Sequence, residues 1–305
     1  MDPYTAPVGD RDHGPTVAIA AFDGWTDAAD AASDVVEHLA LTWDGDEVAV
    51  IDDERYFDYQ QTRPTITLTD GVLRRVRWPA VQIVRCRPPG AAREVLIVHG
   101  PEPSLYWRGF AAELLDRLVE LGAETIVTVG ALLADTAHTR PVDVTGSAFT
   151  AEAARRFGLS PSNYDGPTGM TGVLQDACVR AGVPAVSLWG AVPHYFAQSP
   201  SPKVMLALLR ALQDVTGVAM PVGDLPARAA EWERTIDELT AADEDIGDYI
   251  RSLEERGDDD TAAAVDAMDG AELAEEFERF LRRRGDDGPG DGAPGPDRSD
   301  EQHPE

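Results

Sequence analysis

The stretch WGAVPHYFAQSPSP, residues 189–202, indicates how this chain folds. It ends an apolar run that begins at Ala185 and is typical of a buried strand. Residues 193–195 (PHY) then form a loop, and Ser201-Pro202 is typical of a helix start, with serine as the N-cap and proline in the first turn. In α/β folds, loops that follow strands carry binding sites, so this junction is the first candidate site.

Short apolar runs alternate with helical periodicity along most of the chain. The apolar runs predict strands at 16–22, 47–51, 94–98, 125–129 and 185–189. Apolar residues at helical spacing predict helices at 27–41, 104–121, 151–157, 171–181 and 202–216. Ser104 is expected to cap the second of these helices. This alternation predicts an α/β fold with a mostly parallel sheet sandwiched by helices.

Two regions depart from the alternation. Residues 64–87 contain three strand-like runs and the turn dipeptide Asp70-Gly71, which predict an antiparallel flap or edge beside the parallel sheet. Residues 226–256 and 270–284 have helical periodicity and predict a C-terminal helical hairpin. We therefore expect a disordered N-terminus at 1–15, an α/β domain at 16–224, a helical region at 225–284 and a disordered acidic tail at 285–305.

The composition limits the classes of partner. The formal net charge is −29, and Lys203 is the only lysine among 305 residues. About half of the excess negative charge lies from Asp243 onward. Such acidity argues against nucleic acid and anionic membranes as partners. The polar start and the absence of a long apolar run favour a cytoplasmic protein. Cys86 and Cys178 fit buried free thiols, and no Cys/His spacing predicts a metal site.

Charged and aromatic side chains gather at four strand-to-loop junctions and in the glycine-rich stretch 163–172. Because the carboxyl ends of parallel strands lie at one edge of a sheet, we expect these side chains to converge on one rim. The candidate rim residues are Asp23, Trp25, Glu102, Trp107, His138, Arg140, Tyr164, Thr168, His194 and Tyr195. Their carboxylate, imidazole and guanidinium groups suit acid–base chemistry or anion binding.

Most of these candidates also have a structural interpretation. Asp23 and the glycine after it fit a turn, and Glu102 fits a cap on the helix that follows it. His138 and Arg140 fit a solvated loop, and the tryptophans fit the core. Residues 193–195 fit subunit packing as well as they fit catalysis.

The usual signatures of nucleotide binding and nucleophilic catalysis are missing. The glycine-rich stretch lacks the Lys-Ser/Thr pair of a phosphate-binding loop. The chain has no Gly-x-Ser-x-Gly elbow and no pair of histidines at the spacing of a zinc-binding helix. We therefore expect no cofactor and no metal.

Four segments carry a resemblance to a known family. They are HGPEPSLYW (99–107), GALLADTAHTRPVDVTG (130–146), YDGPTGMTGVL (164–174) and WGAVPHYFAQSPSP (189–202). Together they resemble the PAC2 family of proteasome assembly chaperone 2-like proteins, in its actinobacterial form, over about residues 15–255. The resemblance implies a phosphorylase/hydrolase-like α/β fold, self-association with a trimer as one expected form, and a link to the 20S proteasome.

Three functional hypotheses remain open at this point. The leading one is a non-enzymatic, chaperone-like interaction role linked to 20S proteasome subunits. The alternative is a small-molecule-binding protein or a hydrolase/phosphorylase-like enzyme that uses the rim. A third assigns the docking of a basic partner to the acidic C-terminal helices. Residues 189–195 and those helices are the candidate seams between subunits.

Overall fold

A computed structural model describes residues 14–69, 73–162, 164–241 and 244–255. Except for residues 165–167, these residues belong to one compact unit. The expected helix at 270–284 and the expected disorder at both ends lie outside the described residues, apart from Gly14 and Pro15, which begin the first strand. The proposed division into domains therefore stays a prediction.

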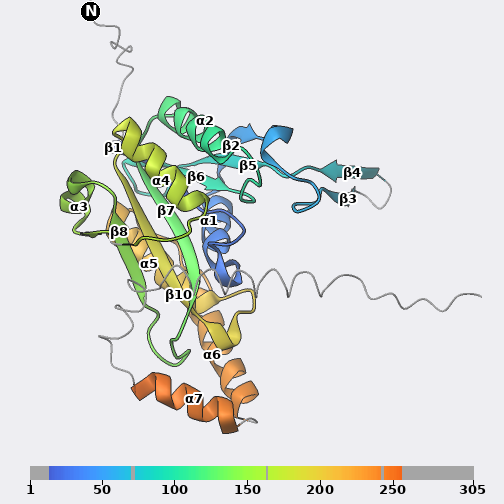
Figure 1. The fold of residues 1–305 in the computed structure, drawn as a ribbon, viewed down its shortest axis with the longest axis vertical. Coiled ribbons are helices and arrows are strands. Elements are labelled where there is room, and N and C mark those ends of the chain that lie inside the picture. The colour runs from blue at the N-terminus through green and yellow to red at the C-terminus, as the bar shows by residue number, and fades with distance from the viewer. Residues whose placement is uncertain (1–13, 70–72, 163, 242–243, 256–305) are drawn as a thin grey trace, which may run out of the picture. The chain divides into compact units, whose positions relative to one another are not determined.

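The unit is built on an eight-stranded sheet with the order β2-β5-β6-β1-β7-β10-β8-β9 (Figure 1). The strands are β1 Gly14–Ala20, β2 Asp46–Ile51, β5 Val81–Cys86, β6 Arg93–His99, β7 Ala123–Ala134, β8 Val144–Ala148, β9 Ser160–Pro161 and β10 Ala185–Pro193. The central strands β6, β1, β7 and β10 run parallel, whereas β2, β5 and β8 pair antiparallel. The mostly parallel sheet is confirmed.

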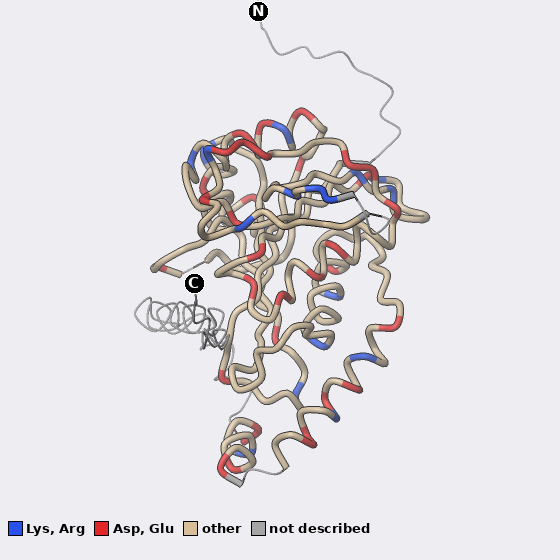
Figure 2. The backbone as a smooth tube through the Cα atoms, turned by 90° about the vertical axis from the view of Figure 1, so that its right-hand side faces the viewer, with Lys and Arg blue, Asp and Glu red and all other residues tan. Residues whose placement is uncertain are grey.

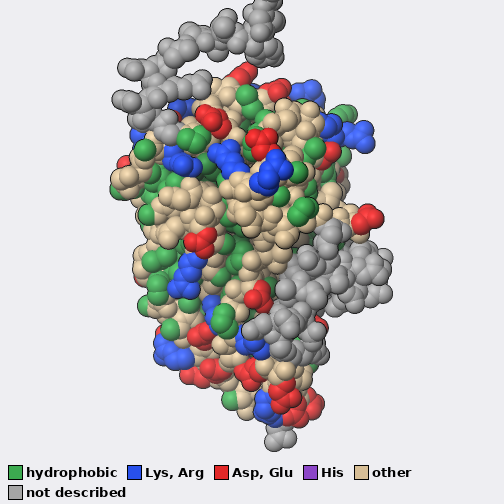
Figure 3. All heavy atoms as spheres, turned by 90° about the vertical axis from the view of Figure 1, so that its left-hand side faces the viewer, with side chains coloured by type: hydrophobic (Ala, Val, Ile, Leu, Met, Phe, Trp, Pro, Cys, Tyr) green, Lys and Arg blue, Asp and Glu red, His purple; other side chains and the backbone are tan. Residues whose placement is uncertain are grey.

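Helices cover both faces of this sheet, as predicted. They are α1 Ala31–Thr42, α2 Trp107–Glu120, α3 Ala151–Phe157, α4 Met170–Ala181 and α5 Pro202–Thr216. Buried residues of α1 and α5 share a hydrophobic core on one face, and those of α2 and α4 share another on the opposite face. On the side where α3 and β8 lie, basic and acidic side chains are interspersed with apolar ones (Figure 3).

The antiparallel flap and the C-terminal helices are both present. β3 (Thr65–Thr69) and β4 (Leu73–Arg77) pair only with each other and project away from the main sheet (Figure 1). The third predicted strand of the flap is β5, which joins the main sheet instead. The single helix predicted over 226–256 is two helices, α6 (Leu225–Thr240) and α7 (Glu244–Glu255).

Two predicted helix starts are wrong. The helix expected from Asp27 starts at Ala31, because Ala29 and Asp30 have left-handed φ values of 54° and 53°. The helix expected from Ser104 starts at Trp107, because the Ser104 N–H donates to the carbonyl of Tyr56 at 2.8 Å. The start of α1 therefore reflects the backbone conformation of residues 29 and 30, and the start of α2 reflects a contact with a distant segment.

The start of α5 is as predicted, although its predicted cap is not. Pro202 is the first residue of the helix, but the Ser201 hydroxyl is buried and makes no capping hydrogen bond. None of the helices within the described residues has the length and apolar character needed to cross a membrane.

Candidate functional site

The predicted rim residues fall into two groups at different levels of the sheet. The pairing of β1 with β7 ends at Ala20↔Thr128, whereas β7 stays paired with β10 as far as Ala134↔Pro193. Asp23 and Glu102 follow the shorter strands β1 and β6. His138 and Tyr195 follow the extended ends of β7 and β10 and form a group of their own.

The first group is centred on Glu102. Its backbone N–H donates to the carbonyl of Asp23 at 2.9 Å, and its carboxylate accepts the N–H of Met170, the first residue of α4. Glu102 therefore caps a helix, but it caps α4 and not the helix that follows it in sequence. Gly24 has a φ of +148°, and a Cβ atom there would lie 3.3 Å from the Glu102 Cβ. Burial raises the pKa of the Glu102 carboxyl.

Two aspartates lie beside this cap. Partial burial, together with the charges of Glu37 and Asp30, raises the pKa of Asp23 to about 6, although the Asp23 side chain still contacts solvent. Asp27 is 5% exposed, and burial raises its pKa to about 7. The Asp27 Oδ1 atom accepts the N–H of Ala32 at 2.7 Å, so Asp27 caps α1 from outside the helix.

Asp27 was not among the predicted site residues. The sequence did offer one indication of its role. Asp27 stands at the start of the predicted helix 27–41, and aspartate is a common helix-capping residue. The sequence gives no sign that this carboxylate is buried, because that depends on the loop doubling back through two left-handed residues, Ala29 and Asp30.

Four other candidates take structural or peripheral positions. Trp107 begins α2 and packs against the core beneath that helix. Thr168 lies against Gly172, where a Cβ atom would collide with its hydroxyl. Trp25 is half-buried, and Tyr164 is exposed.

The second group is centred on His138, which is buried. The Tyr195 hydroxyl accepts the backbone N–H of His138 at 2.7 Å and lies 2.7 Å from its Nδ1 atom. The His138 Nε2 atom lies 3.0 Å from Asp237 Oδ1 on α6. Since Asp237 can only accept, Nε2 carries the ring proton and Tyr195 donates to Nδ1. Every polar atom of the imidazole thus has a partner.

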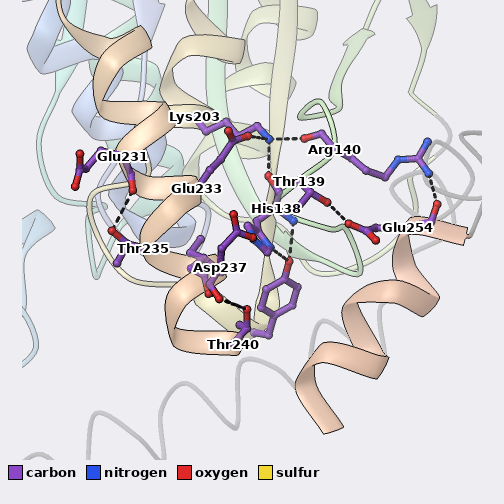
Figure 4. Close-up of polar contacts among 12 residues, drawn as sticks. His138, Thr139, Arg140, Lys203, Glu231, Glu233, Thr235, Asp237, Thr240 and Glu254 are labelled. Atoms are coloured by element: carbon purple, nitrogen blue, oxygen red, sulfur yellow. Dashed lines mark hydrogen bonds and ion pairs between the residues drawn. The ribbon is translucent and has the colours of Figure 1, made fainter. Parts of the chain in front are cut away.

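Lys203 extends this network into α5 (Figure 4). Its ammonium group contacts the carbonyl of His138, the carbonyl of Arg140 at 2.6 Å, and the carboxylate of Glu233 on α6. We call His138, Tyr195, Lys203 and Asp237 the His138 latch. The latch ties the loop after β7 to α5 and α6.

The helix α7 is fastened to the same loop. Arg140 donates to the backbone carbonyl of Glu254 at 2.8 Å, as Figure 4 shows. Asp135 pairs with His194 at 3.1 Å and accepts the Tyr249 hydroxyl of α7 at 3.2 Å. The charged loop residues that suggested acid–base chemistry are therefore attachment points for C-terminal helices.

The chemistry of the latch is that of a structural network. Burial raises the pKa of Tyr195 to about 12, so its hydroxyl stays protonated near neutral pH. That hydroxyl already accepts one hydrogen bond and donates another. Its proton is directed at the imidazole of His138. Within the described residues, no group of three or more His, Cys, Asp and Glu side chains is arranged to hold a metal ion.

Two further features concern the predicted seam at 189–195. Trp189 is half-buried against β7, where a Cβ atom on Gly130 would lie 2.5 Å from its ring. A pocket of about 280 Å³ lies next to this segment, and none of the ten candidate residues lines it. The residues that line it are Phe196, Gln198, Ser199, Pro200, Pro202, Arg228, Glu231 and Trp232. Trp189 and Tyr195 are both half-buried.

Comparison with known proteins places this arrangement in a family. Residues 21–240 match the PAC2 family, which is more than half of the chain. The chain belongs to the PAC2 family. This PAC2 protein is similar to a solved Mycobacterium tuberculosis protein described as a proteasome-assembly chaperone homologue. The two share 52% identity with a TM-score of 0.71, over 77% of this chain and 99% of that one.

Other solved structures agree with the assignment. A PAC2 family protein from Streptomyces avermitilis has 48% identity and a TM-score of 0.73, over 77% of this chain and 99% of that one. An archaeal proteasome activator from Pyrococcus furiosus has the same fold at 16% identity, with a TM-score of 0.59 over 76% and 95% of the two chains. A comparison with curated proteins found no match.

Proposed function

We propose that this PAC2 protein has a non-enzymatic, chaperone-like interaction role linked to the 20S proteasome in the cytoplasm. The observation that carries the proposal is the 52% identity to the M. tuberculosis proteasome-assembly chaperone homologue, which the match covers almost completely. The likeness in fold to the archaeal proteasome activator is consistent with it.

The structure of the latch supports an interaction role over a catalytic one. Its histidine, tyrosine and aspartate bond to one another, and its lysine bonds to backbone carbonyls and to Glu233. Such a network fixes the positions of α5 and α6 relative to the strand ends and engages each of these groups in a contact within the chain. A rigid surface of this kind favours binding, because its side chains are already ordered in the free protein. The entropy cost of ordering them is then not incurred when the partner binds.

We also propose that the protein self-associates, with a trimer as one form to be tested. In the predicted seam at 189–195, Trp189 packs on β7 and Tyr195 belongs to the latch, but both are only half-buried and His194 is exposed. This seam stays a proposal.

The proteasome link can be tested by reconstitution. Purified proteasome α and β subunits of the encoding organism would be mixed with and without the protein, and 20S formation followed on native gels. We expect either faster 20S formation or a complex of the protein with an unfinished assembly. An unrelated acidic protein of similar mass and net charge controls for non-specific binding to basic subunits. If neither the rate nor the set of complexes changes, the proposed role is wrong.

A further inference from the structure

The hairpin β3–β4 exposes an apolar face. In an antiparallel pair, residues opposite each other lie on the same face. The pair Ile66↔Val76 and the neighbouring pair Leu68↔Arg74 therefore share one face. Ile66, Leu68 and Val76 are 62%, 61% and 51% exposed. The opposite face carries threonines and arginines, including the pairs Thr65↔Arg77 and Thr67↔Arg75.

These exposed apolar side chains are clustered, unlike the single apolar residues that are scattered over most protein surfaces. Three exposed apolar side chains lie together on two adjacent strands, and Trp78 directly after β4 is 53% exposed as well. A two-stranded hairpin is marginally stable in water unless something packs on its apolar face. The amphipathic pattern therefore indicates a surface that is covered in the working protein.

The charge of the hairpin is opposite to that of the rest of the chain. Residues 63–78 hold four arginines and one acid, Asp70, whereas the whole chain carries −29. None of these arginines forms an ion pair with another residue of the described ranges. Figure 2 views this side and shows the basic stretch on the hairpin strands. Arg74 lies on the apolar face, and Arg75 and Arg77 lie on the other face, so the hairpin as a whole is suited to an acidic partner.

The same chain offers an acidic surface at the start of α1. Asp23, Asp30 and Glu37 are exposed, and Asp34 is half-buried beside them. Burial raises the pKa values of Asp23 and Asp34, and the charges of Asp30 and Glu37 raise both further, while Arg228 lowers the pKa of Asp34. The four acids therefore repel one another. We call them the α1 acidic patch. A cation brought against this patch would relieve that repulsion.

We propose that the β3–β4 hairpin docks on a second copy of this chain, with its apolar face covered by that copy and its arginines drawn to the α1 acidic patch. The partner is a second copy because hairpin and patch are complementary in charge and occur in every chain. This gives a surface to the self-association proposed above. Its test reads oligomeric mass and not proteasome assembly, so the two proposals fail separately.

The apolar contact is tested by the double variant Ile66→Thr/Val76→Thr, examined by sedimentation velocity over a range of concentrations. Threonine keeps the strand propensity of the hairpin and removes the apolar face. We expect the dissociation constant to rise about thirtyfold, from the apolar area lost at two buried positions. The matched control is Val179→Thr, which alters an exposed valine on α4 and should leave the mass unchanged.

The charge contact is tested by Asp30→Asn/Glu37→Gln. In a chain of net charge −29, neutralising two acids should strengthen self-association if only overall repulsion matters. The proposal expects the opposite, a dissociation constant several times higher, because the arginines lose their partners. Arg74→Gln/Arg77→Gln should weaken association in the same way.

Three results would overturn the proposal. The first is a wild-type protein that stays monomeric at concentrations up to about 100 μM. The second is a hairpin variant that associates as strongly as the wild type. The third is tighter association of the Asp30→Asn/Glu37→Gln variant. If the wild type is monomeric but the hairpin variants lose proteasome-subunit binding, the hairpin docks a different acidic protein and the second-copy assignment is wrong.

Discussion

Replacing Asp27 by asparagine should change how the stability of the protein depends on pH. The folded-state pKa of Asp27 is about 7, against 3.8 for the unperturbed group. A pKa that is raised in the folded state means that folding favours the protonated form. Between these two values the folded protein holds a proton that the unfolded chain has released, so this group's contribution to stability falls as the pH rises.

The magnitude follows from the size of the shift. A difference of about three pKa units corresponds to about 4 kcal/mol at about 1.4 kcal/mol per unit. The Asp27→Asn variant keeps an oxygen that can accept the N–H of Ala32, and its amide can donate to the Ser33 hydroxyl. That hydroxyl can then donate to the carbonyl of Asp30, which lies 3.2 Å away. The variant therefore keeps the cap without a buried charge.

The assay is urea unfolding of both proteins at several pH values between about 4 and 8. The stability of the variant minus that of the wild type should increase by about 4 kcal/mol across this range. Other titrating groups contribute to both proteins and cancel in the difference. Asp23→Asn is the control, and it should give a smaller change because the pKa of Asp23 is raised only to about 6. A difference that stays constant with pH would refute the assignment of a buried, neutral Asp27.

Three other substitutions test the remaining contacts by urea unfolding. Tyr195→Phe should cost about 2 kcal/mol, because it leaves two polar groups of His138 unpaired, and a cost near zero would contradict the latch. Glu102→Ala should cost about 1 kcal/mol through the lost helix cap, while Glu102→Gln keeps most of it; equal losses in both would argue against a capping role. Gly130→Ala should cost about 2 kcal/mol because its Cβ collides with the Trp189 ring, and combining it with Trp189→Leu should recover part of that loss.

The sequence predicted the elements whose pattern is local. The start of α5 at Pro202 and the ends of α3 and α4 at Gly158 and Gly182 are where the capping residues indicated. The antiparallel flap followed from strand periodicity and from the dipeptide at 70–71. Such features depend on neighbours within one or two turns of chain.

The strands β7 and β10 were predicted too short for a different physical reason. The predicted strands stop at residues 129 and 189, just before Gly130 and Gly190, yet both strands continue past these glycines. Gly130 lies under the ring of Trp189, and a Cβ atom on Gly190 would lie 2.8 Å from Val204. The glycines are there because of crowding and not because the chain turns. Crowding of this kind comes from side chains on other elements, so no local pattern reveals it.

The candidate site could be predicted only as a set of residue types. The sequence indicated His138, Tyr195 and Glu102 as unusual, but not their partners. Asp237 is 99 residues from His138, and Met170 is 68 residues from Glu102. A single rim was expected because all parallel strands were assumed to end at one level. The extra length of β7 and β10 separates the two groups.

The contacts of Lys203 limit how readily reagents and enzymes can modify its amino group. It is the only lysine in the chain, its side chain is 15% exposed, and its amino group is held by two carbonyls and a carboxylate. Amine-reactive labels, and enzymes that attach tags through an isopeptide bond, need an accessible and unprotonated ε-amino group. In the folded protein, the ε-amino group of Lys203 is therefore a poor target for them. Modification at Lys203 would therefore report opening of the C-terminal helices, and the rate of labelling would measure how often they open.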